Sequence, residues 1–249
     1  MSTEPGPGRV VLVTGGSRGI GLACARRFQS LGDRVAITYR SAPPAVLGGP
    51  GPGGADLLAV PCDVRRPDEV EAAFRAVESA LGPVEVLVAN AGVTKDTLLL
   101  RMGEAAWDEV IDTNLSGVYR VVRRALGPMV RAHRGRIVLV SSVVAFLGSP
   151  GQVNYGAAKA GLVGLARSLA REVGSREITV NVVAPGVVDT DMIAGLGQQR
   201  VEQLQAMVPL GRKASPAEVA GAVAFLASAD AAYITGAVLP VDGGLGMGL

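Results

Sequence analysis

Short runs of aliphatic and β-branched residues alternate with longer helical patterns along almost the whole chain, and this alternation restricts the fold more than any other feature. The expected strands are Val10–Thr14, Val35–Tyr39, Leu57–Pro61, Val84–Ala89, Arg136–Ser141, Ile178–Val183 and Ala237–Val241. Several of them lack polar alternation, which is typical of strands covered by helices on both faces. The pattern therefore predicts an α/β fold with a doubly wound, seven-stranded parallel sheet.

The helical patterns fill the intervals between these strands. They are Ile20–Leu31, Pro67–Leu81, Glu104–Arg131, Val153–Val173 and Pro216–Ala227. Two stretches differ. Residues 41–56 are rich in Pro and Gly, which disfavour a helix, so we expect a surface loop. Residues 193–213 lack strong periodicity, and we expect a lid over the site. We divide the chain into a flexible N-terminal arm, residues 1–8, and one domain, residues 9–249.

Composition excludes several classes of protein. The 249 residues are 49% hydrophobic and carry a net charge of only +2, which argues against disorder and gives no basis for nucleic-acid binding. No apolar stretch reaches the length of a membrane span, and the polar N-terminus is not a signal peptide, so we expect a cytoplasmic protein without membrane insertion. Cys24 and Cys62 are expected to be buried thiols, and the single histidine, His133, leaves no basis for a histidine metal site.

The segment Thr14–Gly21 follows the first expected strand and opens the first helix, with the spacing G-x-x-x-G-x-G. Gly15 permits a tight turn, Gly19 lets the backbone approach a pyrophosphate, and Gly21 allows close packing of the helix. The helix N-terminus supplies N–H groups and partial positive charge. The sequence therefore predicts a dinucleotide site in a Rossmann-type domain. The segment lacks Gly-Lys-Ser/Thr, which argues against a P-loop nucleotidase.

The end of the second strand indicates which dinucleotide binds. An NAD site usually has an acidic residue there, whereas this strand is followed by Arg40. Arg40 and Arg18 are suited to bracket a 2′-phosphate, so we predict NADPH; the alternative is that both are merely solvated. Asp63 and Val64, after the third strand, are placed to touch the adenine, although Asp63 would serve nearly as well as a helix N-cap.

Tyr155 and Lys159 lie four residues apart on one face of an expected helix, and Ser142 follows the fifth strand. A nearby lysine cation favours the phenolate and is expected to lower the Tyr155 pKa, which makes the tyrosine a better acid–base catalyst. Ser142 would donate to a substrate carbonyl oxygen. A Tyr-x-x-x-Lys pair alone is common on helices, but these three residues on a dinucleotide fold predict a catalytic site that acts on a carbonyl.

With these motifs, the sequence resembles the short-chain dehydrogenase/reductase family from about Arg9 to Leu249. Within it, the chain is most similar to bacterial 3-oxoacyl-[acyl-carrier-protein] reductases. The motifs that carry the resemblance are TGGSRGIG at 14–21, Asn90-Ala91-Gly92, Asn114, Ser142, Tyr155-x-x-x-Lys159, Pro185-Gly186, Asp189-Thr-Asp-Met192 and Tyr233-Ile-Thr-Gly236. The segment 41–56 departs from the family pattern and leaves the local shape beside the 2′-phosphate pocket in doubt.

The resemblance implies roles for individual residues. Tyr155 would give its proton to the ketone oxygen, Ser142 would orient the carbonyl, and both would bind substrate. Lys159 would bind the nicotinamide ribose, and Asn114 would hold a water that relays protons to it. Val188 and Thr190 would contact the nicotinamide carboxamide. The full cofactor set is Gly15, Ser17, Arg18, Gly19, Ile20, Gly21, Arg40, Asp63, Val64, Asn90, Ala91, Gly92, Tyr155, Lys159, Pro185, Gly186, Val188 and Thr190.

Family members typically form homotetramers by pairing the helix that corresponds to Val153–Val173. That helix is rich in Gly and Ala here, which suits either this pairing or packing within one chain. Arg131, Arg134, Arg136 and Arg176 form either a basic patch for an acidic acyl carrier protein or a solvated surface. The leading hypothesis is an NADPH-dependent 3-oxoacyl thioester reductase. The alternatives are a reductase of another ketone (acetoacetyl-CoA, a polyketide or a xenobiotic carbonyl) and, outside enzymes, a dinucleotide-binding regulator.

Overall fold

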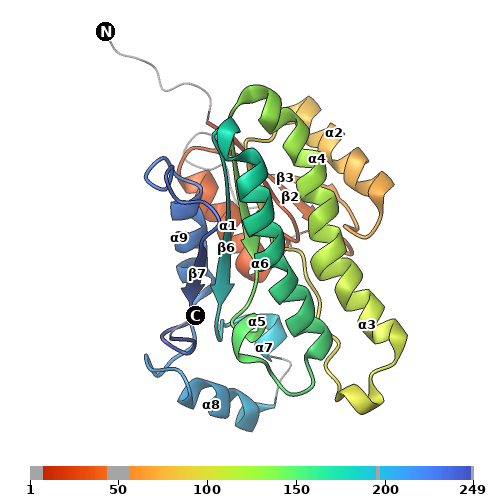
Figure 1. Cartoon of the computed structure of the whole chain (residues 1–249), viewed down its shortest axis with the longest axis vertical. Helices are drawn as coiled ribbons and strands as arrows, with labels where there is room; N and C mark the ends of the chain where they lie inside the picture. Colours follow the sequence, from red (N-terminus) through yellow and green to blue (C-terminus); the bar gives the residue numbers. More distant parts are fainter. Residues whose placement is uncertain (1–7, 44–56, 195–196, 248–249) are drawn as a thin grey trace.

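A computed structural model describes residues 8–43, 57–194 and 197–247, and within them seven parallel strands form one sheet in the order β3-β2-β1-β4-β5-β6-β7 (Figure 1). The strands are β1 (Val10–Val13), β2 (Arg34–Tyr39), β3 (Leu58–Pro61), β4 (Val86–Ala89), β5 (Gly135–Val140), β6 (Ile178–Pro185) and β7 (Val238–Val241). The predicted fold is confirmed. Residues 1–7 of the predicted arm and most of the Pro/Gly-rich loop lie outside the described residues.

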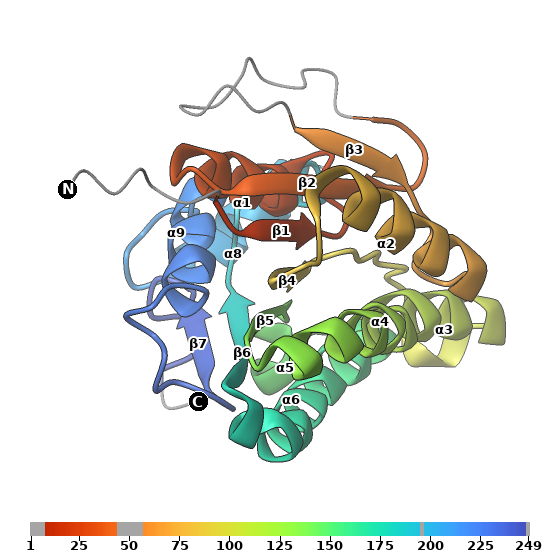
Figure 2. The ribbon, with the colours of Figure 1, turned by 90° about the horizontal axis from the view of Figure 1, so that it is seen from above.

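Helices cover both faces of the sheet, as the view from above shows (Figure 2). On one face, α1 (Gly19–Ser30) packs beside α9 (Pro216–Leu226); the other face is covered by α2 (Pro67–Leu81), α4 (Gly117–Ala132) and α6 (Val153–Val173). Successive strand residues point to opposite faces, so Val10 and Leu12 join one buried cluster while Val11 and Val13 join the other. This two-sided burial explains the continuous apolar strand sequences.

The long helix expected over residues 104–131 is divided by a π turn. It consists of α3 (Glu104–Ile111), the π turn η2 (Asp112–Ser116) and α4, which follow one another without a break. Such π turns are rare in proteins, but those that occur are often found at functional sites. The hydrophobic pattern continues through the insertion, so periodicity alone does not reveal it. Asn114 lies in this turn rather than in a regular helix.

The expected lid contains two helices, α7 (Asp191–Ala194) and α8 (Gln198–Ala206). They lie beyond the carboxyl ends of β6 and β7 (Figure 1). The sequence of α8 is predominantly polar, so it shows no apolar stripe and was not predicted as a helix. The remaining short elements are η1 (Leu99–Arg101), α5 (Val144–Leu147) and η3 (Gly174–Arg176).

Smaller predictions are also tested by the structure. Ser215 and Glu218 form a capping box at the start of α9, where a helix is predicted. Cys24 and Cys62 are buried free thiols. His133 ends α4 in the left-handed backbone conformation and is exposed, beside Arg176. Among the described residues, no helix is long and apolar enough to cross a membrane, and no group of metal-ligating side chains gathers.

Candidate active site

The predicted site residues lie beyond the carboxyl ends of β1, β4, β5 and β6, which are neighbours in the sheet. The strand order reverses between β1 and β4, and a doubly wound sheet binds its ligands in the crevice at such a point. The glycine segment follows β1, Asn90 follows β4, and Ser142 lies two residues after β5. The topology therefore brings together residues that are more than 100 positions apart.

The segment Thr14–Gly21 forms a tightly held loop. Gly15 has a φ of 63°, which favours glycine, and a Cβ atom on Gly21 would lie 2.4 Å from the Gly15 oxygen. The Asn90 side-chain amide donates to the main-chain oxygens of Thr14 and Gly15, both at 3.0 Å. The Thr14 hydroxyl accepts from the backbone N–H groups of Asn90 and Ala91 at 3.1 and 3.2 Å. Thr14 and Asn90 thus fix the loop to the end of β4, a role that the sequence analysis did not assign to either.

The start of α1 suits an anionic group. Its N-cap residue, Arg18, has an extended backbone and makes no side-chain cap, so no described side chain occupies the first N–H groups in that way. A helix N-terminus with such groups binds phosphate readily. A Cβ atom on Gly19 would lie 3.4 Å from the Thr190 methyl, so the segment after β6 lies opposite the loop. The partly exposed Ser17 and Ile20 complete the surface of the loop.

The residues expected near the adenosine end have specific partners. Arg18 forms an exposed ion pair with Asp191, 3.0 Å apart, and Arg40 is exposed just beyond β2. The Arg65 side chain binds Asp63 and, with a smaller contribution from Arg40, lowers the pKa of that carboxyl. The alternative that Asp63 caps a helix is wrong, because Arg66 is the N-cap of α2 and Asp63 instead accepts from the Arg65 backbone N–H at 3.0 Å. The neighbouring Val64 is buried.

Tyr155 and Lys159 lie on successive turns of α6, with the Lys159 nitrogen 5.6 Å from the centre of the Tyr155 ring. The same nitrogen donates to the Val140 oxygen at 2.7 Å. Ser142 is held in extended backbone beside β6, because Ser141 N–H donates to Val183 and Val143 N–H to Pro185. Its hydroxyl is hydrogen-bonded with that of Tyr155. The three predicted catalytic residues are therefore brought together.

Burial controls the ionisation of both groups. It raises the pKa of Tyr155 to about 12; the hydrogen bond with Ser142 acts in the opposite direction, and the Asp96 carboxylate adds to the rise. Burial lowers the pKa of Lys159 to about 8. The expectation that Lys159 lowers the Tyr155 pKa is therefore not met in this structure. The physical reason is that desolvation of the phenolate, the largest contribution, outweighs the lowering of the pKa by Ser142.

Asn114 has both side-chain polar atoms engaged. Its Oδ1 accepts from the Val93 N–H and its Nδ2 donates to the Val93 oxygen, each at 2.8 Å. A Cβ atom on Gly92 would lie 3.1 Å from Asn114 Oδ1 and 3.6 Å from the Lys159 nitrogen. Asn114 therefore fixes the chain after β4 beside Lys159, where Gly92 leaves room. The predicted water relay stays a prediction.

The segment after β6 is also held in place. A Cβ atom on Gly186 would lie 2.7 Å from the Asp242 Cα, so only glycine fits this approach. The buried Val188 bridges to Ala214, and the Thr190 hydroxyl donates to the Val188 oxygen at 3.3 Å. These contacts fix the segment at the carboxyl end of β6 that contains the predicted cofactor residues Pro185, Gly186, Val188 and Thr190.

Two buried polar residues beside the catalytic positions were missed as functional candidates. The Asn154 side chain donates to the main-chain oxygens of Lys95 and Ala106 at 3.3 and 3.1 Å and accepts from the Tyr155 N–H at 2.8 Å. The Ser141 hydroxyl donates to the Lys159 main-chain oxygen at 2.8 Å. Both therefore position the catalytic segment. The available signal was their place directly before Tyr155 and Ser142.

The fold and this site together define a dinucleotide-binding α/β protein with a Ser-Tyr-Lys constellation. Residues 15–246 match the family described as enoyl-(acyl carrier protein) reductase, a branch of the short-chain dehydrogenases/reductases. The chain therefore belongs to the short-chain dehydrogenase/reductase family, which implies a nicotinamide dinucleotide as cofactor.

Curated relatives match over nearly the full chain. The chain is 50% identical over 240 residues to the 3-oxoacyl-[acyl-carrier-protein] reductase MabA of Mycobacterium tuberculosis, covering 96% of this chain and 94% of that protein. It is 45% identical over 242 residues to the 3-oxoacyl-[acyl-carrier-protein] reductase FabG of Escherichia coli, covering 96% and 98%. FabG of Staphylococcus aureus is 46% identical over 239 residues, covering 95% and 97%.

Proposed function

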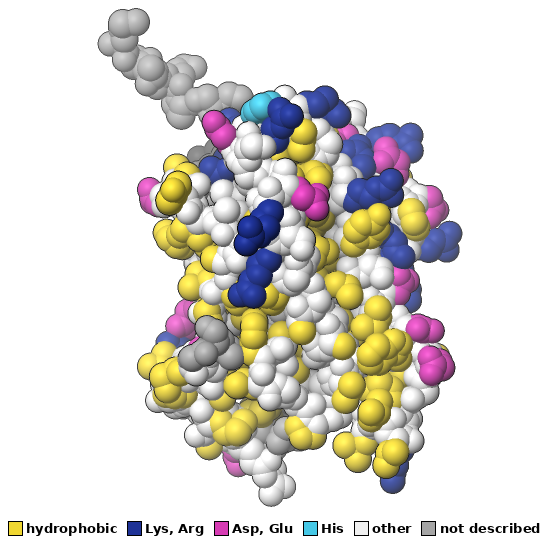
Figure 3. All heavy atoms as spheres, viewed as in Figure 1, with side chains coloured by type: hydrophobic (Ala, Val, Ile, Leu, Met, Phe, Trp, Pro, Cys, Tyr) yellow, Lys and Arg dark blue, Asp and Glu magenta, His cyan; other side chains and the backbone are white. Residues whose placement is uncertain are grey.

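We propose that this protein reduces 3-oxoacyl thioesters, carried on acyl carrier protein, to 3-hydroxyacyl thioesters with NADPH in fatty-acid biosynthesis. The observation that carries the proposal is that Ser142, Tyr155 and Lys159 lie together, at the same end of the sheet as the segment Thr14–Gly21. The names of the relatives support the substrate class. Exposed apolar side chains gather at the end of the molecule that holds these three residues (Figure 3), and such a surface suits an acyl chain. They include Leu98, Leu99, Leu100, Leu147 and Met207.

The site residues account for the proton and the charge in this reaction. A bound reduced nicotinamide supplies hydride to the carbonyl carbon. Tyr155 donates its proton to the carbonyl oxygen, and Ser142 donates a hydrogen bond to the same oxygen, where negative charge develops. The raised pKa of Tyr155 keeps the phenol protonated at neutral pH, which is the form that reduction requires. The Lys159 cation then stabilises the phenolate left behind.

The described residues fit a dinucleotide with a 2′-phosphate. The segment Thr14–Gly21 and the start of α1 would hold the pyrophosphate, and Arg18 with Arg40 would bracket the 2′-phosphate. Residues 40–43, which follow β2, include no acidic side chain. Lys159 would bind the nicotinamide ribose. The other proposed contacts come from Asp63, Val64, Asn90, Ala91, Gly92, Pro185, Gly186, Val188 and Thr190.

One assay tests the function. The loss of NADPH absorbance is followed with acetoacetyl-CoA and then with carrier-linked 3-oxoacyl chains of several lengths, beside Tyr155→Phe. We expect turnover that increases with carrier-linked substrates and falls about 100-fold or more in the variant. A 2-enoyl thioester is included, because the matching family is described as enoyl reductase. Reduction of the enoyl substrate alone, or only of simple ketones, would contradict the proposal.

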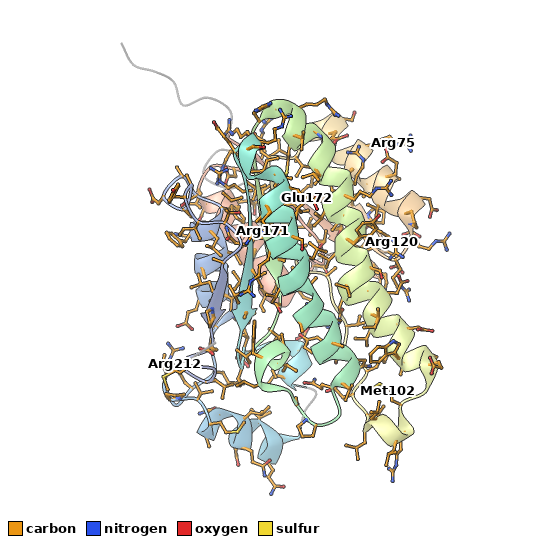
Figure 4. The ribbon with its side chains drawn as sticks, in the orientation of Figure 1. Arg75, Met102, Arg120, Arg171, Glu172 and Arg212 are labelled. Carbon is orange, nitrogen blue, oxygen red and sulfur yellow. The ribbon has the colours of Figure 1, made fainter. Side chains whose placement is uncertain are left out.

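The proposed homotetramer uses the exposed face of α6, where Ala157, Ala160 and Gly164 permit close approach of another helix. Arg171 and Glu172, labelled in Figure 4, lie further along that outward face. Size-exclusion chromatography with light scattering tests this assembly. A monomer with full activity would refute it.

The proposed carrier patch includes Arg131, Arg134, Arg136 and Arg176. In one subunit, these residues lie near the end of α6 opposite Tyr155. An antiparallel pairing of two α6 helices would place the Arg176 end of one subunit near the Tyr155 end of its partner, which joins the two proposals. We expect Arg176→Glu to lower kcat/KM for carrier-linked substrates but not for acetoacetyl-CoA. Equal loss with both substrates would exclude a carrier patch.

The two reduced cysteines accord with a cytoplasmic location, which we also propose.

A further inference from the structure

The segment after β4 is joined to the turn that precedes Tyr155. We call residues 95–97 the strap and residues 151–154 the entry turn. Three hydrogen bonds connect them, one from each strap residue: Asn154 Nδ2 to the Lys95 oxygen at 3.3 Å, Gln152 Nε2 to Asp96 Oδ2 at 2.8 Å, and Thr97 N–H to the Gly151 oxygen at 2.9 Å. The start of α6 is therefore positioned by a segment that is distant in sequence.

The bond between Asp96 and Gln152 differs from the other two, because it joins two side chains and brings a formal charge. Gln152 is the N-cap residue of α6, and Tyr155 follows three residues later in the first turn. Asp96 is exposed and Gln152 is half-buried. From the strap the chain continues through η1 to Met102, labelled in Figure 4, at the same end of the molecule as α5 and α7. Asp96 thus acts on the helix end that carries Tyr155.

Within the described part of the chain, two elements bring charged groups to Tyr155. Lys159 faces the ring from α6 itself, and Asp96 faces it from the strap. Ser142, beyond β5, contributes a neutral hydroxyl. The strap also carries a cation, Lys95, which forms an ion pair with Glu109 of α3, 3.4 Å apart. The Asp96 charge raises the pKa of Tyr155, in the same direction as burial.

We propose that Asp96 is a positioning residue: through Gln152 it fixes the start of α6, and its carboxylate charge, which faces Tyr155 from the strap, adds to the burial that disfavours the phenolate. This inference rests on the proposed function. It predicts that Asp96 favours reduction over the reverse oxidation, in which the phenolate must accept the proton of the 3-hydroxyl group.

Oxidation of 3-hydroxybutyryl-CoA by NADP+ at pH 8 tests the charge effect on the full-length enzyme. Asp96→Asn removes the charge but keeps an oxygen that can accept from Gln152. If the Tyr155 pKa falls by about 0.5 unit, the phenolate fraction and the oxidation kcat/KM rise about threefold. A merely structural loss would lower this rate instead. Asp108→Asn, an exposed carboxylate on α3, is the matched control and should leave the rate unchanged.

Gln152→Ala separates positioning from charge. The substitution removes the hydrogen bond between Gln152 and Asp96 but leaves the Asp96 carboxylate in place. We therefore expect kcat/KM to fall about tenfold for both reduction and oxidation, without a gain in oxidation. The inference is overturned if Asp96→Asn oxidises no faster than wild type, or if Gln152→Ala keeps full activity. If wild type reduces no thioester, the proposed function fails separately. Tyrosinate absorbance, taken as the difference from each protein's Tyr155→Phe counterpart, then still tests the charge effect.

Discussion

The Lys159 ammonium group donates to the main-chain oxygen of Val140 at 2.7 Å, and its side chain is buried at the end of β5. Val140 offers a neutral acceptor rather than a counter-charge. The resulting desolvation lowers the pKa of Lys159 to about 8. A cation in this position destabilises the fold, because the unfolded chain can hydrate the same charge. A residue to which we assign a catalytic role is thus held at a thermodynamic disadvantage.

We therefore expect Lys159→Met to raise the free energy of unfolding at pH 7 by about 1–3 kcal/mol while it abolishes most turnover. The gain should be largest below about pH 8, where lysine is protonated in both the folded and the unfolded state. It should shrink toward pH 10.5, where both states become neutral. Urea unfolding at pH 7 and 9.5 measures both effects, with the exposed Arg26→Met as control. A stability gain that increases with pH would contradict this explanation.

Two glycine substitutions compare a crowded position with an open one. A Cβ atom on Gly21 would lie 2.5 Å from the Asn90 side-chain nitrogen and closer still to the Gly15 oxygen. Gly21→Ala must therefore displace the segment Thr14–Gly21. We expect NADPH affinity to fall at least about tenfold and stability to fall by about 1–3 kcal/mol. A Cβ atom on Gly221, inside α9, would meet no described atom within 4 Å, and Gly221→Ala should add about 0.5–1 kcal/mol. NADPH fluorescence titration and urea unfolding check both.

We expect the cofactor preference to depend on Arg40. Arg40→Asp replaces a cation with a carboxylate at the end of β2, which repels a 2′-phosphate and accepts from a 2′-hydroxyl. We expect the ratio of kcat/KM for NADPH to that for NADH to fall at least about tenfold. Arg75→Asp, on the outer face of α2 (Figure 4), is the control and should leave the ratio unchanged. An unaltered ratio in Arg40→Asp would remove the basis for NADPH selectivity by this residue.

The parts of this protein that sequence predicts well are those governed by burial and by special backbone geometry. Every strand run in the sequence became a strand, because the two-sided burial of a parallel sheet demands apolar residues throughout. Gly15 and Gly21 were identified for the same reason, since their positions exclude a side chain. The polar helix α8 was missed because it has no apolar stripe, and the π turn because the surrounding pattern continues through it.

The ionisation of Tyr155, in contrast, could not be predicted from the sequence. Proximity of Tyr155 to Lys159 suggested a lowered tyrosine pKa, but the degree of burial depends on packing of the whole chain and reverses the direction. Partners such as Asp96 and Gln152 are 56 residues apart, and nothing in their spacing indicates that they meet. Sequence thus indicates the candidate reacting groups, whereas their ionisation depends on tertiary contacts.

Asn114 offers the sharpest separation of structural and catalytic roles. Its side chain pairs with both main-chain groups of Val93, so Asn114→Ala leaves the partly buried N–H and C=O of Val93 without this partner and should lower stability by about 2–4 kcal/mol. Asn181, in β6, is equally buried and also makes two main-chain bonds, to Ile234 and Ala237. Asn181→Ala should therefore lose similar stability. Only Asn114→Ala should also lower kcat at least about tenfold at temperatures where both variants are folded, because Asn114 lies beside Gly92 and Lys159. Equal kcat in the two variants would show that Asn114 serves the fold alone.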